Sequence, residues 1–213
     1  MTSRIKVLIV DDHRVFAEAL TLALGKESDI QVADPPALTG EDAVHAVQEF
    51  EPDVVLMDVG LPGIDGIEAT RRIREARPGT AVVILTSEAG ASRLPAAAAA
   101  GACGYLDKTV ALDDLGAAVR AAFAGQILLP EASPAGAADA PALTAPFDML
   151  TPREQEVLEL LAEGLPNRDI ARRLVLSVRT VDTHVHNLLI KLGVHSKLEA
   201  VVKAMRAGVI GRR

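Results

Sequence analysis

Three aspartates, one threonine and one lysine in the first half of the chain each follow a short apolar run. They are Asp11, Asp12, Asp58, Thr86 and Lys108. If the runs form one parallel sheet, these side chains meet at a single edge, because parallel strands all end on the same side. Clustered carboxylates repel one another, and a hard divalent cation with oxygen ligands relieves that repulsion. Mg²⁺ takes few carboxylates and keeps several waters, so the sequence predicts a magnesium site beside a hydroxyl and an ammonium group.

Asp58 ends the clearest of these runs. Residues 54–57, Val-Val-Leu-Met, are too few for a buried helix and rich in β-branched valine, which predicts a strand buried on both faces. The chain then breaks at Gly60, Pro62 and Gly63. Ligands of open parallel sheets bind in the crevice beyond the strand ends, so the Asp58 carboxylate is predicted to be available for chemistry.

The elements that must position these residues alternate between strand and helix up to residue 125. The expected strands lie near residues 5–10, 30–33, 53–57, 81–85 and 103–106. This (βα)5 pattern predicts an α/β domain with a parallel five-stranded sheet covered by helices on both faces. The first helix is expected to bury a stripe made of Phe16, Leu20, Ala23 and Leu24. Pro95 interrupts the fourth helix, over residues 92–100, which is otherwise mostly alanine.

Charge and composition divide the chain into parts. Residues 1–150 carry 11 Lys and Arg against 22 Asp and Glu, net −11, whereas residues 151–213 carry 11 against 7, net +4. Residues 126–147 are rich in Ala, Pro and Gly with few bulky side chains to bury, which predicts a semi-extended linker. We therefore expect domains at 1–125 and 148–213 joined by a linker at 126–147. The basic domain is the one suited to nucleic acid.

The basic domain is expected to be all-helical. Thr151, Pro152 and Glu154 form the start of a helix with a capping box, and three more helices are expected near 167–174, 178–192 and 196–206. The middle two, joined by a short turn, predict a helix-turn-helix. The inward stripe of the second is expected to comprise Val178, Val181, Val185, Leu188 and Leu192. The polar outer face, which suits base edges in a major groove, comprises Arg179, Asp182, Thr183, His186 and Asn187.

Residues 1 to about 125 resemble the receiver domain of two-component response regulators, through the acidic pair, the aspartate, the threonine and the lysine at successive strand ends. The resemblance implies a flavodoxin-like fold in which Asp58 takes a phosphoryl group from a sensor histidine kinase. It also implies that Mg²⁺ is held by Asp12, Asp58 and the backbone carbonyl of Gly60, with Asp11 acting through water.

The same resemblance implies roles for three further residues. Lys108 would pair with the phosphoryl oxygens, Thr86 would donate a hydrogen bond to one of them, and Tyr105 would be a switch aromatic that turns inward. Two features depart from the family pattern: the alanine-rich fourth helix with Pro95, and Thr109 after Lys108, where many receivers have proline.

The last 60 or so residues resemble the LuxR-type four-helix DNA-binding domain. The resemblance rests on Leu-Thr-Pro-Arg-Glu at 150–154, Glu-Gly-Leu at 163–165, Asn-Arg-Asp-Ile-Ala at 167–171 and Thr-Val-Asp-Thr-His-Val at 180–185. Together the two resemblances imply a response regulator of the NarL/FixJ class that binds promoter DNA. Base contacts would come from Asp182, Thr183 and His186, and phosphate contacts from Arg179, His184 and Lys191. The last helix would pair two chains into a homodimer through Leu198, Val201, Val202 and Met205.

Two residues of this domain depart from the family pattern. Asp182 stands where a lysine is common, and a carboxylate repels phosphates but accepts a hydrogen bond from cytosine N4. Pro166 replaces a frequent serine and removes a hydroxyl cap, and Asn167 is the expected replacement.

Phosphorylation of Asp58 is expected to shift the chain from a form in which the receiver masks the second domain to one in which two such domains pair on DNA, with RNA polymerase as a further partner. One alternative keeps DNA binding but has the receiver sense a ligand or partner protein independently of phosphorylation. A phosphatase with an Asp58 nucleophile is disfavoured, because haloacid dehalogenase-type enzymes carry a second Asp two residues on, where this chain has Gly60. We therefore expect no enzyme.

Other features predict an ordinary cytoplasmic protein. No apolar run reaches the roughly 20 residues of a membrane helix, and the first residues lead directly into a strand. Cys103, the single cysteine, is expected to fill buried space. His13, beside the acidic pair, is expected to pack at a helix start instead of binding metal.

Overall fold

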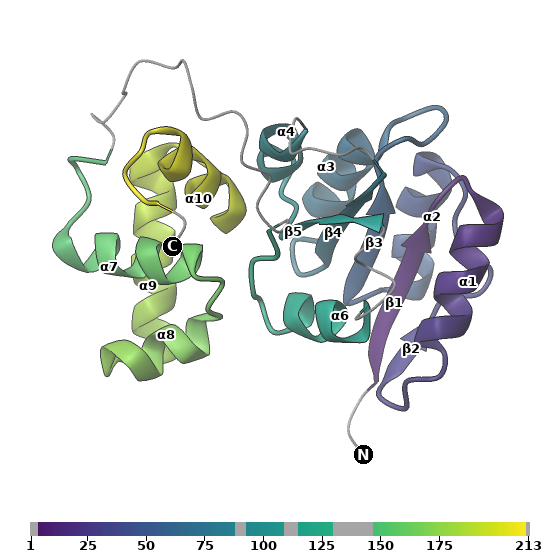
Figure 1. Ribbon diagram of the computed structural model, residues 1–213, viewed down its shortest axis with the longest axis horizontal. Coiled ribbons are helices and arrows are strands. Elements are labelled where there is room, and N and C mark those ends of the chain that lie inside the picture. The colour runs from purple at the N-terminus through teal and green to yellow at the C-terminus, as the bar shows by residue number, and fades with distance from the viewer. Residues whose placement is uncertain (1–3, 88–92, 109–114, 130–146, 212–213) are drawn as a thin grey trace.

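The computed structural model describes residues 4–87, 93–108, 115–129 and 147–211, which form two units. In the N-terminal unit strands and helices alternate (Figure 1). The elements are β1 (Ile5–Val10), α1 (Arg14–Leu24), β2 (Ile30–Val32), α2 (Gly40–Phe50), β3 (Val54–Asp58), α3 (Gly66–Ala76), β4 (Ala81–Thr86), α4 (Leu94–Ala99), β5 (Gly104–Asp107) and α6 (Leu115–Phe123). The predicted α/β alternation is confirmed.

The five strands form one parallel sheet in the order β2-β1-β3-β4-β5. The register joins Val10 to Met57, Met57 to Ile84 and Ile84 to Tyr105, so the strands end in nearly the same row. Apolar residues of α1 and α6 pack on one face of the sheet, and those of α2, α3 and α4 on the other. The sheet is therefore buried on both faces, as expected for a parallel sheet.

Two local expectations need correction in this unit. In α1 the fully buried residues are Ala17, Leu20 and Leu24, whereas Ala23 is exposed, because the helix turns a different stripe to the sheet. Pro95 does not interrupt α4 but lies in its first turn, where its missing N–H costs no hydrogen bond. Residue 92, the first of that predicted helix, lies outside the described residues.

The predicted linker begins later than residue 126. Ile127 is buried, and residue 128 bridges to β5: Tyr105 N–H donates to the Leu128 carbonyl at 2.9 Å, and Leu128 N–H donates to the Cys103 carbonyl at 3.1 Å. These apolar residues extend the sheet edge. The rest of the predicted linker, residues 130–146, lies outside the described residues, as does Thr109.

The C-terminal unit contains α7 (Pro152–Ala162), α8 (Asn167–Leu174), α9 (Val178–Leu192) and α10 (Lys197–Arg206). The capping box of Thr151 and Glu154 is confirmed, and Ser177 caps α9 by accepting from Thr180 N–H. One expectation for α9 is wrong: Val178 is 44% exposed, because the first turn of the helix projects beyond the core.

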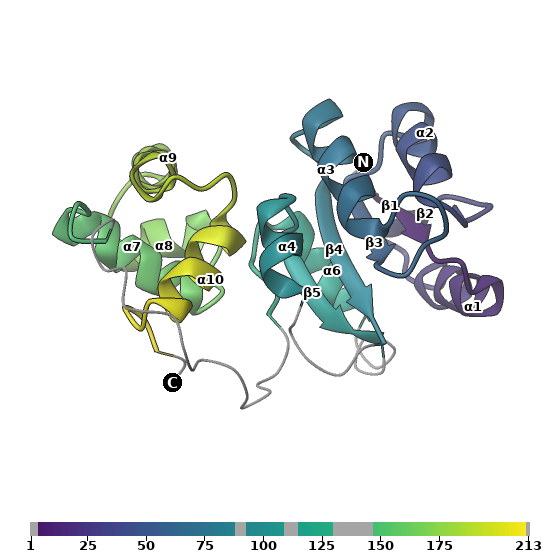
Figure 2. The ribbon, with the colours of Figure 1, turned by 90° about the horizontal axis from the view of Figure 1, so that it is seen from above.

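The two units pack together through α4 and α10, which lie side by side in both ribbon views (Figures 1 and 2). The N-cap of α10, Ser196, accepts from Glu199 N–H at 3.0 Å and donates its own hydroxyl proton to the Ala98 carbonyl of α4 at 2.8 Å. Buried Ala97 and Ala98 belong to the same apolar cluster as Leu198 and Val201. The Ser196 hydroxyl and the packed apolar side chains of α4 and α10 therefore join the two units.

Candidate functional site

The carboxyl-terminal edge of the sheet brings the predicted acidic residues together. Asp11 follows β1, Asp58 ends β3, and Thr86 ends β4, and all three are buried. Lys108, just beyond β5, places Nζ 2.6 Å from Asp11 Oδ2 and 3.1 Å from Asp58 Oδ1. The structure thus brings the carboxylates and the ammonium group together, and Thr86 ends the neighbouring strand β4.

Asp11, Asp12, His13 and Asp58 each offer a ligand atom within 4.8 Å of the others. The donor set is dominated by carboxylate oxygens, which fits a hard cation such as Mg²⁺. The expectation that His13 packs at the start of α1 is wrong. Its side chain is 74% exposed, and Nδ1 lies 2.9 Å from Asp12 Oδ1, since the ring turns toward the carboxylates.

The pKa values of both Asp58 and Lys108 are raised at this site, for different reasons. Burial raises the pKa of Asp58, and the nearby charge of Asp11 adds to that rise, although the hydrogen bond and charge of Lys108 oppose it. Burial lowers the pKa of Lys108, but its hydrogen bonds and ion pairs with Asp11 and Asp58 outweigh burial and leave that pKa above its ordinary value. The lysine therefore stays charged, whereas the Asp58 carboxylate is costly to ionise without a further cation.

Two aromatic residues border the acidic residues. The Phe16 ring of α1 lies 5.0 Å, measured to its centroid, from Lys108 Nζ, a cation–π distance that helps fix the ammonium group. Sequence reasoning treated Phe16 only as core. Tyr105 is 1% exposed, so the predicted switch aromatic lies in the interior, beside Ile84 of β4.

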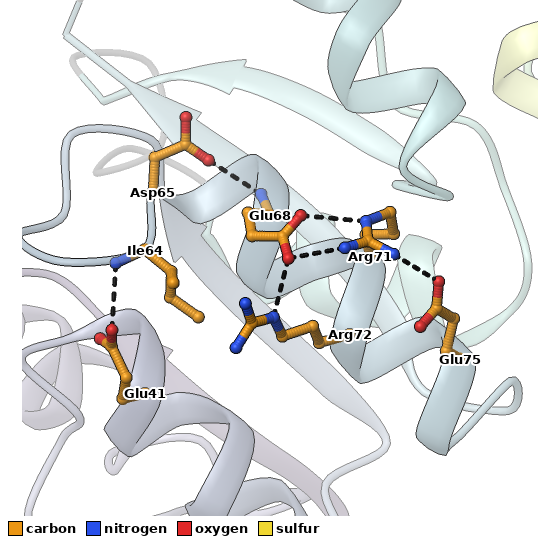
Figure 3. Close-up of polar contacts among 7 residues, drawn as sticks. All are labelled: Glu41, Ile64, Asp65, Glu68, Arg71, Arg72 and Glu75. Carbon is orange, nitrogen blue, oxygen red and sulfur yellow. Dashed lines mark hydrogen bonds and ion pairs between the residues drawn. The ribbon is translucent and has the colours of Figure 1, made fainter.

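The loop between β3 and α3, which contains Gly60, is held from α2 (Figure 3). Glu41 of α2 accepts a hydrogen bond from Ile64 N–H at 3.2 Å, and Asp65 caps α3 by accepting from Glu68 N–H at 2.8 Å. Glu68 in turn binds Arg71 and Arg72 along α3 (Figure 3). No local pattern predicts this role of Glu41, because its contact spans 23 positions of the chain.

Gly66 permits the close approach of α3 to the end of strand β3. A Cβ at Gly66 would lie 1.8 Å from the Asp58 carbonyl oxygen, a backbone atom that cannot move aside. We expect Gly66→Ala to lower the free energy of unfolding by about 3 kcal/mol through this overlap. Urea unfolding measures the change. Gly79→Ala is the control, since a Cβ there meets nothing within 4 Å. Equal stability of both variants would contradict the close approach.

The second predicted site is the outer face of α9. Arg179, Asp182, Thr183, His186 and Asn187 are all exposed, as expected, and His184 is half-buried. The Thr183 hydroxyl donates back to the Arg179 carbonyl at 3.0 Å. Lys191 is partly buried, with Nζ 2.7 Å from Glu154 Oε2 of α7, so it has a partner within the unit. The base and phosphate contacts assigned to these residues remain predictions.

Asn167 does not cap α8, contrary to expectation. The N-cap of α8 is Pro166, with no side-chain cap, because Asn167 is already the first helical residue. Its Nδ2 donates to Asp182 Oδ1 of α9 at 2.6 Å instead. Asp182 is thereby attached to the other helix of the motif.

The predicted pairing residues of α10 lie in different surroundings. Leu198 and Val201 are fully buried inside the unit, and Met205 is half-buried. Val202 lines a hollow of about 280 Å³ between α10 and α4, together with Ala98 and Lys203. The surface of α10 that could meet a second chain is therefore turned toward α4.

We call the contact between α4 and α10 the joint. Charged and thiol groups lie beside it. Burial lowers the pKa of Lys197, the first residue of α10, and the charges of Asp182 and Cys103 oppose that shift. Burial raises the pKa of the Cys103 thiol to about 11, although the charge of Arg74 favours the thiolate and opposes that rise. The structure agrees with a mostly buried filler role for Cys103.

Cys103 can report on the joint. The thiolate is the reactive form, so with this raised pKa we expect iodoacetamide at pH 8 to modify Cys103 on the order of a hundredfold more slowly than a free thiol. The rate should rise as pH rises toward 11, the value burial gives this thiol, and also when α10 leaves α4. Mass spectrometry follows the modification, with Cys103→Ser as blank. A free-thiol rate in the resting protein would contradict the burial.

Comparisons with known proteins agree with this architecture. Residues 7–120 match the family described as response regulator receiver domain, and residues 148–204 match the family described as bacterial regulatory proteins, luxR family. The response regulator protein VraR of Staphylococcus epidermidis is 35% identical over 97% of this chain and 99% of its own. VraR of Staphylococcus aureus is also 35% identical over the same shares.

Solved structures of response regulators share this fold. The response regulator ChrA of a heme-sensing two-component system is 33% identical, with a TM-score of 0.52, over 99% of this chain and 100% of that one. The response regulator RcsB in complex with DNA shares the fold, with 24% identity and a TM-score of 0.53 over 95% and 99% of the two chains.

A receiver-type sheet edge with an acidic pocket, followed by a luxR-type helix-turn-helix, defines a two-component DNA-binding regulator. This chain belongs to the response regulator family with a LuxR-type DNA-binding domain. Across the described ranges, every helix is too short or too polar to cross a membrane.

Proposed function

We propose that phosphorylation of Asp58 by a sensor histidine kinase releases α10 from α4, so that two chains pair and bind promoter DNA. The observation that carries this proposal is the joint itself: the predicted pairing helix is packed against the domain that contains the phosphoacceptor. The restraint and the phosphoacceptor thus belong to one structural unit.

The residues at the sheet edge suit phosphoryl transfer. The Asp58 carboxylate attacks the phosphorus, so that the new O–P bond forms as the bond to the kinase histidine breaks. Asp12, Asp58 and the Gly60 carbonyl, with Asp11 through water, would hold Mg²⁺, which neutralises charge on the transferred group when bound. Lys108 already lies 3.1 Å from Asp58 Oδ1 and can follow the phosphoryl oxygens. Thr86 ends the neighbouring strand and supplies a hydroxyl donor.

The path from Asp58 to the joint is short in the fold. Thr86 ends β4, α4 is the next described helix, and Tyr105 of β5 pairs with Ile84 of β4. A shift of Thr86 toward a phosphoryl group would therefore act on the elements that carry Ala97 and Ala98. The joint includes the Ser196–Ala98 hydrogen bond and apolar contacts between α4 and α10, and a modest change of their fit is expected to shift the population of the packed form.

The DNA-binding part of the proposal rests on the exposed polar face of α9 and the positive charge of residues 151–213, net +4. One such unit makes few phosphate contacts, so pairing two units on adjacent half-sites supplies the remaining affinity. RNA polymerase is the partner that a promoter-bound dimer would meet. Partners of this kind support a cytoplasmic location for the protein.

We expect no enzymatic turnover beyond slow hydrolysis of the protein's own acyl phosphate. The loop after Asp58 offers Gly60 where a phosphatase of the aspartate-nucleophile class would need an acid. Intact-protein mass spectrometry after incubation with a small phosphoryl donor and Mg²⁺ tests the proposal. One added phosphoryl group per chain supports it. An unmodified protein that still binds DNA would favour a receiver that responds to a ligand or partner instead.

A further inference from the structure

A hydrogen bond between Asn167 and Asp182 joins the two helices of the helix-turn-helix. Asp182 lies on the exposed face of α9, and Asn167 begins α8. The Asn167 amide donates to Asp182 Oδ1 at 2.6 Å, a short hydrogen bond to a charged acceptor. A carboxylate can only accept here, so the nitrogen of the Asn167 amide must face it. The side chain of Asp182 is therefore fixed in direction.

Fixing one carboxylate oxygen leaves the other as an acceptor of fixed orientation. Asp182 lies three residues after Arg179 and four before His186, on one stripe of the helix. The Asn167 amide reaches from the interior to Asp182, since its Oδ1 is buried while its Nδ2 donates to the carboxylate. The pair therefore presents a preorganised anionic acceptor at the centre of the exposed stripe.

The chemistry of the major groove decides what such an acceptor can meet. Guanine presents two acceptors and thymine an acceptor and a methyl group, so both repel or ignore a carboxylate. Adenine presents an amine beside an acceptor, N7. Cytosine presents only its N4 amine, which donates to Asp or Glu side chains. A fixed carboxylate is thus selective for cytosine and against guanine.

We infer that Asn167 and Asp182 form one base-reading unit that selects a cytosine in each half-site of the operator. Asp182 accepts from cytosine N4, and Asn167 is its positioning residue. This inference rests on the proposed DNA binding and adds to it the identity of one base. The negative charge of Asp182 repels the DNA phosphates at every site. Where cytosine is absent, no hydrogen bond offsets that repulsion, so binding to other sequences is weakened.

The test is selection of bound duplexes from a randomised operator library by the phosphorylated full-length chain. Wild type should enrich cytosine at one position per half-site, and Asp182→Asn should reduce that enrichment roughly tenfold while other positions keep their preference. Asn167→Ala should weaken the same position only, whereas a purely structural role would lower binding to all sequences alike. Asp169→Asn is the matched control, since it removes one negative charge from α8, where Asp169 pairs with Arg172 at 2.5 Å.

The outcomes separate this inference from the proposed function. If wild type binds no sequence above random duplex, the proposed DNA binding fails and the base-reading unit fails with it. If wild type is selective and Asp182→Asn keeps the same cytosine preference, the base-reading unit alone is overturned. Equal loss of cytosine preference in Asp169→Asn would also overturn it, because the effect would then come from charge.

Discussion

Asp58→Asn is expected to abolish phosphoryl uptake from a small donor, because the amide is not a nucleophile, and to remove phosphorylation-dependent dimerisation with it. The variant should fold well. Burial raises the pKa of Asp58 in the folded, metal-free protein. The protonated side chain therefore stabilises the fold at pH values below the ordinary pKa, and this stabilisation is lost as pH rises through the raised pKa. At neutral pH the buried charge therefore costs stability, and the neutral amide should raise the thermal midpoint.

The comparison needs a control of equal charge change. Asp42→Asn alters an exposed aspartate in the first turn of α2 that is not one of the candidate metal ligands, and should leave phosphoryl uptake unchanged. Intact mass after treatment with donor and Mg²⁺ reports the uptake, and scanning calorimetry reports the midpoint. Uptake by Asp58→Asn at the wild-type level would show that another group accepts the phosphoryl.

Ala98→Glu is expected to produce dimers and DNA binding without any phosphoryl donor. Ala98 is fully buried between α4 and α10, and its carbonyl accepts the Ser196 hydroxyl. A glutamate there cannot keep its charge in the apolar seam, because an unpaired buried carboxylate costs several kcal/mol. The helices must therefore separate, which frees α10 and mimics the activated form.

The matched control is Ala99→Glu, since Ala99 is the next residue of α4 and is exposed. Analytical ultracentrifugation gives the oligomeric state, and normal phosphoryl uptake by Ala98→Glu shows that its receiver remains folded. A phosphorylatable Ala98→Glu protein that stays monomeric would mean that the joint does not restrain pairing.

The local parts of the structure could be predicted from sequence. Strand ends follow from short apolar runs and the Gly and Pro residues after them, and parallel topology then requires Asp11, Asp58 and Lys108 to meet. Thr151 likewise marks the start of α7, because the hydrogen bonds of its capping box span only three positions.

Contacts between distant segments could not be predicted. Ser196 and Ala98 lie 98 positions apart, and alanine carries no pattern that identifies its partner. Asn167 was expected to cap α8, since the preference of asparagine for helix starts is a local rule, whereas its bond to Asp182 depends on how two helices cross. The exposed ring of His13 likewise follows from attraction to Asp12 across the start of α1.

The most direct test of the account is the solution mass of the full-length wild-type chain before and after phosphorylation, measured with the affinity for operator DNA in the same samples. We expect a monomer that binds DNA weakly at rest, and a dimer that binds at least tenfold more tightly, about 1.4 kcal/mol, once Asp58 is phosphorylated. A phosphorylated chain with unchanged mass and unchanged affinity would contradict the proposal that the α4–α10 joint controls pairing.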